Sequence, residues 1–166
     1  IAGTVDFLFD GAFSAPELSE KLAMLAADEA VSQSGLGTEG HFPGALFMAV
    51  PPVEVEWPQK QELVAGVSDG DITYDTLLKQ AATGGFKPMH ELFSFGGVAN
   101  HVADRFGTEG SPISLSTACS SGATAIQMGV EAIRRGETAA ERCVGHDGSV
   151  HAEALIPFSL LSALST

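Results

Sequence analysis

The sequence predicts a single α/β domain, and three observations support this class. Segments with helical spacing of apolar residues alternate with short apolar runs typical of strands. One strand pattern, near residue 115, runs directly into a long helical pattern. The chain has 166 residues, of which 45% are hydrophobic and 17% charged, which is the composition of one packed globular domain rather than of a disordered segment.

The first 70 residues of the chain predict one helix and one strand. Ser14 and Glu17 have the spacing of a capping box, Pro16 fits the first turn, and leucines follow at helical spacing until Gly35. The apolar residues 45–50 predict a short buried strand. Residues 51–70 are polar and irregular, so no element is predicted there.

The chain beyond residue 70 predicts three helices and a strand. Residues 72–82 and 99–106 have helical patterns, and glycines follow both. Residues 111–117 alternate small polar and apolar residues, as a strand does. Residues 120–135 predict a long helix closed by Gly136. Because this helix is rich in glycine and alanine, we expect it to be largely buried among other elements.

Charge and hydropathy exclude several classes of function. The chain has 21 acidic and 8 basic residues. Its net charge of −13 argues against binding to nucleic acid or to an anionic membrane. No apolar run reaches the roughly 20 residues that span a bilayer, and the first residues lack a basic signal-peptide region. We therefore expect a soluble, cytoplasmic protein.

The cysteines and histidines do not predict a metal site or a disulfide. Cys119 and Cys143 are far apart and form no CxxC pair. Of the five histidines only His146 and His151 share one short segment, and we expect no metal or cofactor.

Cys119 has the setting of a nucleophile. It stands where the strand pattern meets the long helix, and a helix N-terminus offers unpaired N–H groups and a positive dipole end that favour an anion. An ordinary thiol is only about 3% thiolate at pH 7, and a helix N-terminus is one way to raise that fraction. The same amides could hold an oxyanion. The alternative is a small buried core residue, since free cysteines are often buried.

Several segments between residues 100 and 166 resemble one enzyme family. They are Asn100, Arg105-Phe106-Gly107, Gly110-Ser111-Pro112, Thr117-Ala118-Cys119-Ser120-Ser121-Gly122, Glu131-Ala132-Ile133-Arg134-Arg135-Gly136-Glu137 and Phe158-Ser159-Leu160-Leu161-Ser162-Ala163-Leu164-Ser165-Thr166. Together they closely resemble the nucleophile region of β-ketoacyl synthases of the elongating type, in the amino-terminal half of that enzyme. Residues 1–89 resemble the family only loosely.

The resemblance implies a fold, a reaction and partners. The fold is thiolase-like, and residues 1–166 are expected to form a partial amino-terminal domain of it. Cys119 would take an acyl group from an acyl carrier protein, and a decarboxylated malonyl unit would then attack that thioester. The family is homodimeric, with the strand before the nucleophile at the subunit interface.

The resemblance also implies what the chain does not supply. The family's catalytic histidines, its lysine and its oxyanion segment lie in the second half, so residues 1–166 are expected to be a fragment inactive in condensation. None of the five histidines present occupies a matching motif.

Some residues depart from the family pattern or have two interpretations. Glu141 and Arg142 fall in an apolar strand of the family, so we expect them to pair or to lie at a sheet edge. His146 replaces a small residue, and Pro157 would break a helix outside its first turn. Packing is favoured for Cys143. For Phe93, Phe95 and Phe106, packing is favoured over a place in an acyl tunnel. For Arg134 and Arg135, a favourable position at the negative end of the helix dipole is favoured over a contact with a carrier protein.

Two other functions stay open. One is a different thiolase-like acyltransferase, although the residues around Cys119 favour the elongating type. The other is a non-catalytic fragment or partner subunit, against which the presence of Cys119 counts.

Overall fold

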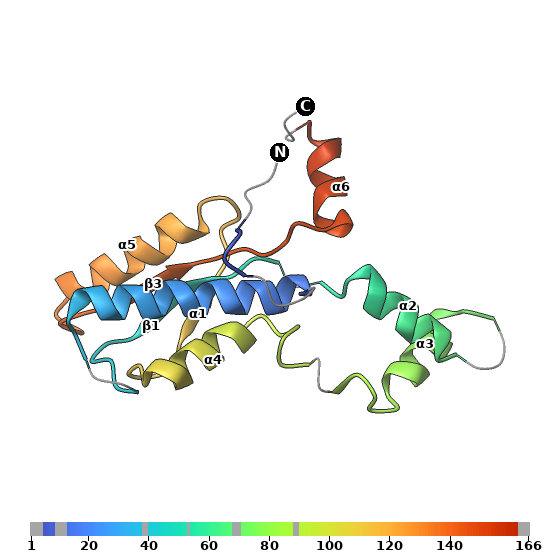
Figure 1. Ribbon diagram of the computed structural model, residues 1–166, viewed down its shortest axis with the longest axis horizontal. Coiled ribbons are helices and arrows are strands. Elements are labelled where there is room, and N and C mark those ends of the chain that lie inside the picture. The colour runs from blue at the N-terminus through green and yellow to red at the C-terminus, as the bar shows by residue number, and fades with distance from the viewer. Residues whose placement is uncertain are drawn as a thin grey trace.

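A computed structural model describes residues 5–8, 13–37, 40–52, 54–67, 71–87 and 90–162 (Figure 1). It confirms an α/β fold in which helices alternate with strands. The elements in chain order are α1 (Ala15–Ser34), β1 (Leu46–Ala49), α2 (Trp57–Ala65), α3 (Tyr74–Ala81), α4 (Gly97–Phe106), β2 (Ile113–Leu115), α5 (Ser121–Arg134), β3 (Arg142–Gly145) and α6 (Ala152–Leu160).

The three strands form one parallel sheet in the order β2-β1-β3. The central strand β1 places Phe47 opposite Ile113 on one side and opposite Cys143 on the other. All four residues of β1 are buried, as expected for a parallel strand covered on both faces. The strand predicted over residues 45–50 is therefore confirmed, and β2 lies at a sheet edge.

Helices α1 and α4 cover one face of the sheet. Alternate residues of β1, Leu46 and Met48, point to this face and join a cluster with Ala23 and Ala27 of α1 and Val102 of α4. Both helices end as the sequence predicts, because Gly35 and Gly107 take up the left-handed conformation after them. The predicted capping box at Ser14 and Glu17 is present.

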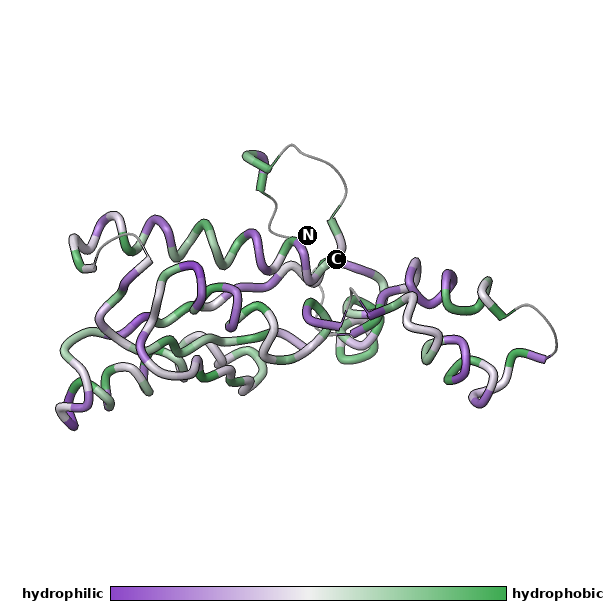
Figure 2. Tube along the Cα trace, turned by 90° about the horizontal axis from the view of Figure 1, so that it is seen from below, coloured by the Kyte–Doolittle hydropathy of each residue, from purple (hydrophilic) through white to green (hydrophobic). Residues whose placement is uncertain are grey.

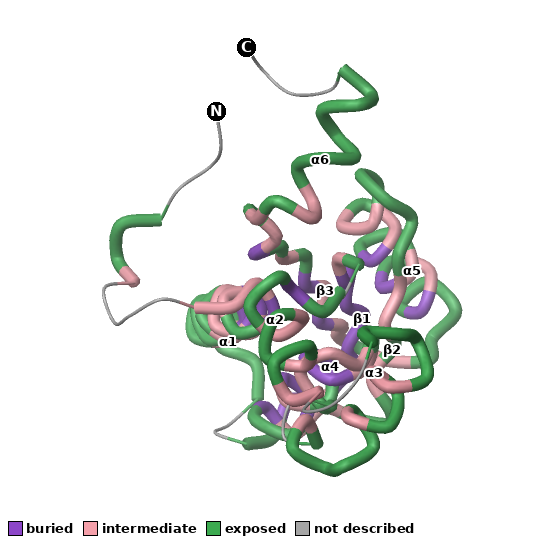
Figure 3. The backbone as a smooth tube through the Cα atoms, turned by 90° about the vertical axis from the view of Figure 1, so that its right-hand side faces the viewer, coloured by how far each residue is buried: buried purple, intermediate pink, exposed green. Residues whose placement is uncertain are grey.

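Helix α5 covers the opposite face. Phe47 and Ala49 pack there against Ala125 and Ala132. The expectation of a largely buried helix was wrong, because only the three small residues on the inner side of α5 are buried: Ala125, Gly129 and Ala132. Small side chains bring the helix close to the sheet, but nothing in the described chain covers its outer side. In Figure 3 the buried positions gather around the strands, whereas α6 is mostly exposed.

The stretch predicted to be irregular contains helix α2, so that prediction was wrong. Helices α2 and α3 pack on each other and extend beyond the end of the sheet (Figure 1). Neither has a fully buried residue, and hydrophobic and hydrophilic residues mix along this extension (Figure 2). Helix α2 has only weak apolar periodicity, whereas α3 has a marked apolar side, and this difference explains why the sequence reveals only α3. Helix α3 forms within the range predicted for it.

Strand β3 is the second edge of the sheet, as expected from its charged residues. Arg142 does not pair with Glu141, however. Its guanidinium is buried between the rings of Phe42 and Phe106, at 4.4 and 4.1 Å from their centroids. Burial lowers the pKa of Arg142 to about 10, although Asp28 opposes this shift. Two aromatic faces thus replace the expected carboxylate partner.

Helix α6 continues through Pro157, which lies at its sixth residue and not in its first turn. The expectation that Pro157 would break a helix here was wrong. The cost of the missing N–H is tolerated in an exposed helix of only nine residues. Within the described residues, no helix has the length and apolar character needed to cross a membrane.

Candidate active site

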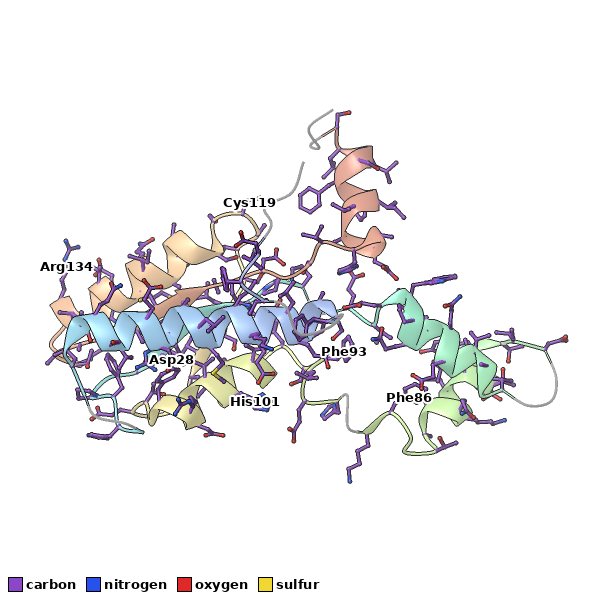
Figure 4. The ribbon with its side chains drawn as sticks, in the orientation of Figure 1. Asp28, Phe86, Phe93, His101, Cys119 and Arg134 are labelled. Atoms are coloured by element: carbon purple, nitrogen blue, oxygen red, sulfur yellow. The ribbon has the colours of Figure 1, made fainter. Side chains whose placement is uncertain are left out.

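Cys119 lies in the tight turn that joins β2 to α5 (Figure 4). Ser120 is the N-cap of α5, so the thiol stands just before the helix. Cys119 is exposed in the described chain, unlike the buried core residue of the alternative interpretation. The preceding Ala118 has φ = 53°, a left-handed conformation that is strained for a residue with a Cβ. The turn therefore holds the thiol on the surface at a backbone cost.

Hydroxyl groups stabilise this strained turn. The backbone N–H of Thr117 donates to Ser121 Oγ over 2.8 Å, and Ser121 Oγ donates in turn to the carbonyl of Ala118 over 2.6 Å. The hydroxyls of Thr117 and Thr124 are 2.9 Å apart and tie the end of β2 to the first turn of α5. These bonds explain why small hydroxyl residues surround the cysteine.

The first turn of α5 offers free amide groups. The amides of Ser121 and Thr124 donate to the carbonyls of Ala118 and Ser120. Those of Gly122 and Ala123 have no acceptor four residues back inside the helix, and no other backbone acceptor is found for them in the described chain. They are the groups that could stabilise an oxyanion formed when Cys119 attacks a carbonyl carbon.

A cleft of about 670 Å³ opens beside Cys119. Its walls come from the ends of β1 and β3, the turn before α5 and the first turns of α6, at the carboxyl edge of the parallel sheet. Ligands of open α/β sheets bind at this edge. The described residues that line the cleft besides Cys119 include Val50, Pro52, Gly122, His146, His151 and Phe158. The cleft is large enough for a small organic substrate.

His151 and Glu153 form an ordered pair in this cleft. His151 Nδ1 is 3.1 Å from Glu153 Oε2, and Lys60 Nζ is 3.8 Å from the other oxygen of that carboxylate. The pKa of Glu153 is lowered, first by its own backbone N–H and then by His151 and Lys60. Glu153 is therefore a carboxylate at neutral pH. Sequence patterns did not predict this pair, although the spacing of a histidine two residues before a glutamate at a helix start could have indicated it.

His146 lines the same cleft in a different state. Both of its ring nitrogens are shielded from solvent and have no hydrogen-bond partner among the described residues. Burial lowers its pKa, with a smaller opposing effect of Asp147. The loop after it is fixed to α1, because the N–H of Gly148 donates to the buried Ser19 hydroxyl over 2.8 Å. His146 is thus held between the cleft and α1.

Other candidate residues lie elsewhere. None of Phe93, Phe95 and Phe106 lines the cleft, so the structure does not support the acyl tunnel for them. Phe106 instead packs on Arg142, and Phe93 lies in the connection before α4 (Figure 4). In the part of the chain that the structure describes, no three histidine, cysteine or acidic side chains are grouped to hold a metal ion.

Cys143 and the two arginines at the end of α5 have structural partners. Cys143 Sγ donates to the carbonyl of Ala125 over 3.3 Å, and burial raises the pKa of this thiol. Arg134 contacts Glu131 at 3.2 Å, and Arg135 contacts Glu137 at 2.7 Å. These contacts agree with a packing role for Cys143. They also agree with a role within the chain, rather than a carrier contact, for both arginines.

The fold and the site together define an α/β protein with an exposed cysteine at a strand-to-helix turn, beside a cleft at the carboxyl edge of the sheet. A model of the family described as β-ketoacyl synthase, N-terminal domain, matches residues 14–166. The chain belongs to this family of condensing enzymes, which implies the thiolase-like fold. Searches of curated proteins and of solved structures found no match to the chain.

Proposed function

We propose that Cys119 is the acyl-accepting nucleophile of a β-ketoacyl synthase that carries out decarboxylative Claisen condensation. The observation that carries the proposal is the position of this thiol, which is exposed in a strained turn before α5 and opens onto the cleft. Strain of this kind gathers at functional sites. The family membership supports the same reaction class.

The first step of the proposed reaction is acyl transfer. The Cys119 thiolate attacks the carbonyl carbon of an acyl thioester, and the amides of Gly122 and Ala123 are placed to stabilise the oxyanion. The bond to the donor sulfur then breaks and leaves an acyl-cysteine. In the second step a malonyl thioester loses CO₂, and its α-carbon bonds to the acyl carbon while the bond from that carbon to Cys119 Sγ breaks and frees the thiolate.

We propose that residues 1–166 complete only the first step. Loss of CO₂ needs groups that stabilise the developing enolate. The family resemblance assigns this role to histidines of the second half of the synthase, and the matched segment is the N-terminal domain.

The proposed partners are an acyl carrier protein, which delivers both thioesters, and a second copy of the chain. Strand β2 supports the second copy, because it is a sheet edge with an exposed Ile113. Sedimentation at micromolar concentration should then show dimers or larger species, and a stable monomer would contradict this. We also propose a cytoplasmic location, where a thiol nucleophile stays reduced.

Acyl transfer tests the proposal directly. The purified chain would be incubated with an acyl-carrier thioester, and the acylated peptide would be identified by mass spectrometry. We expect the acyl group on Cys119, faster labelling of Cys119 than of Cys143 by limiting iodoacetamide, and loss of acylation in Cys119→Ala. Cys143→Ala is the matched control and should still be acylated. Acylation that persists in Cys119→Ala would overturn the proposal, and a β-ketoacyl product formed after addition of a malonyl thioester would refute the limit to the first step.

A further inference from the structure

The cleft beside Cys119 is lined by carboxylates and by no lysine or arginine of the described chain. The three carboxylates are those of Glu54, Asp147 and Glu153. Glu54 and Asp147 are exposed, and exposed carboxyl groups are ionised at neutral pH. Because Glu54 lies between β1 and α2 whereas Asp147 follows β3, negative charge borders the cleft from two separate segments.

No lysine or arginine of the described chain neutralises Glu54 or Asp147. All eight basic residues of the sequence lie in the part that the structure describes. Lys60 contacts a carboxylate of the cleft, because its Nζ is 3.8 Å from Glu153 Oε1. The other seven neither line the cleft nor pair with its carboxylates: Lys21, Lys79, Lys87, Arg105, Arg134, Arg135 and Arg142. Two of the three negative charges are therefore left uncompensated by these residues.

The two histidines of the cleft do not reverse this balance. Burial lowers the pKa of His146, so its imidazole is neutral at neutral pH. His151 Nδ1 is 3.1 Å from Glu153 Oε2, and a neutral imidazole makes this contact by donating from Nδ1. Even a positive charge on His151 would leave the lining negative, because the carboxylates of Glu54 and Asp147 outnumber it.

The charges of the cleft reach an acyl group on Cys119 without touching it. A compact space of about 670 Å³ is roughly 9 Å across, which is close to the screening length of about 10 Å at 0.1 M ionic strength. Part of the wall is apolar, with Val50, Pro157 and Phe158 among its residues. Apolar walls that carry charges of one sign focus the electric field and concentrate ligands of the opposite charge. The cleft therefore favours positively charged ligands beside the thiol.

We infer that the cleft selects acyl groups by their charge, with Glu54 and Asp147 as its specificity-determining residues. An acyl chain that carries a cationic group loads fastest, an uncharged chain loads more slowly, and a chain that ends in a carboxylate loads slowest. The inference rests on the proposed acyl transfer to Cys119. In that transfer the Cys119 sulfur replaces the donor sulfur on the acyl carbon, and the donor leaves as its thiol. The two carboxylates take no part in these bond changes.

The test compares three N-acetylcysteamine thioesters of equal chain length, a pentanoyl chain that ends in a trimethylammonium, a tert-butyl or a carboxylate group. Mass spectrometry gives the rate of acylation of Cys119, and each rate is divided by that of 2-mercaptoethanol with the same thioester. At 0.1 M salt we expect the cationic chain to load on the order of tenfold faster than the anionic one, with the neutral chain between them. In 1 M NaCl, where the screening length is about 3 Å, this ratio should fall toward one.

Variants assign the selectivity to the two carboxylates. Glu54→Gln and Asp147→Ser each remove one charge, and the serine hydroxyl can still accept the bond that Asp147 Oδ1 takes from the N–H of Ser149. Each should lower the ratio of cationic to anionic rates about threefold, the effect of one unit charge several ångströms away in water. Glu29→Gln, an exposed position on α1 outside the cleft, is the matched control and should keep the ratio. A merely structural role would change all three rates alike and leave the ratio as it was.

Charged thiol reagents separate this inference from the proposed function. In the Cys143→Ala chain, a cationic alkyl methanethiosulfonate should modify Cys119 faster than an anionic one, after the same division by the rates with 2-mercaptoethanol. This reaction needs no acyl transfer. Equal normalised rates for the two reagents and for the three thioesters would overturn the inference, as would a Glu54→Gln/Asp147→Ser chain that keeps the full ratio. If no thioester acylates Cys119 while the cationic reagent still reacts faster, the proposed function fails and the charge preference of the cleft stands.

Discussion

The two faces of the sheet are covered to different degrees. On the face of α1 and α4, the side chains of β1 enter a cluster closed by two helices. On the other face, α5 alone packs on the sheet through small residues. The outer side of α5 carries an exposed apolar stripe at helical spacing, formed by Ile126, Val130 and Ile133. The closed face contains the larger buried cluster, and the helix of the open face begins just after the nucleophile.

The largest effect on stability is expected from Leu46→Ala on the closed face. Leu46 has no exposed surface, so its truncation removes apolar burial and leaves a cavity. We expect the free energy of unfolding to fall by about 2–5 kcal/mol in urea denaturation. Leu25→Ala, an exposed leucine on α1, is the matched control and should change it by less than about 0.5 kcal/mol. Equal losses in both variants would show that the closed face is not the main core.

The contact between α5 and the sheet is tested by Gly129→Ala. A Cβ at this position would lie 2.6 Å from Cys143 Sγ, which is too close. We expect a loss of about 1–3 kcal/mol from overpacking, although alanine favours a helix. Gly122→Ala in the same helix meets no atom within 4 Å and should gain up to about 1 kcal/mol.

A double variant sharpens this prediction. If Cys143 Sγ is the obstacle, Gly129→Ala should cost less when combined with Cys143→Ala than it does alone. A Gly129→Ala chain that is more stable than the unmodified chain would contradict the close approach of α5 to the sheet.

The buried position of His146, between the cleft and α1, predicts that the stability of the chain depends on pH. Burial lowers its pKa in the folded chain, so the unfolded chain binds more protons once the pH falls below about 6.5, the ordinary value. The contribution of the neutral His146 to the free energy of unfolding is therefore fully present above this pH. It is lost on acidification, by at most about 1.4 kcal/mol per pH unit. Urea denaturation between pH 7 and 5 measures it. His146→Leu should be less sensitive to pH in this range, and an unchanged slope would contradict the buried neutral state.

The smallest effect is expected on the outer side of α5. Ile126 is 59% exposed, so Ile126→Ala removes little buried surface and places a good helix former in the helix. We expect the free energy of unfolding to change by less than about 0.5 kcal/mol. A loss as large as that of Leu46→Ala would show that a partner copy or another segment covers the open face.

The sequence by itself determined the helices and strands whose signals are local. Ser14 and Glu17 mark the start of α1, because the capping box is made within one turn. Gly107 marks the end of α4, because its left-handed conformation favours glycine. The position of Cys119 before α5 was equally clear, since the strand and helix patterns meet there. Helix α2 was missed because its apolar residues have only weak helical periodicity.

The tertiary structure decided which residues share the site and how deeply they are buried. His151 and Glu153 reach the cleft of Cys119 because parallel strands bring their following loops to one edge of the sheet, across more than thirty residues of chain. Arg142 is buried because Phe42 and Phe106, distant in the sequence, enclose its guanidinium. The exposure of α5 also depends on its neighbours, because the same small residues fit a helix covered on one side or on both. Local patterns encode where the backbone turns, and burial depends on packing between distant segments.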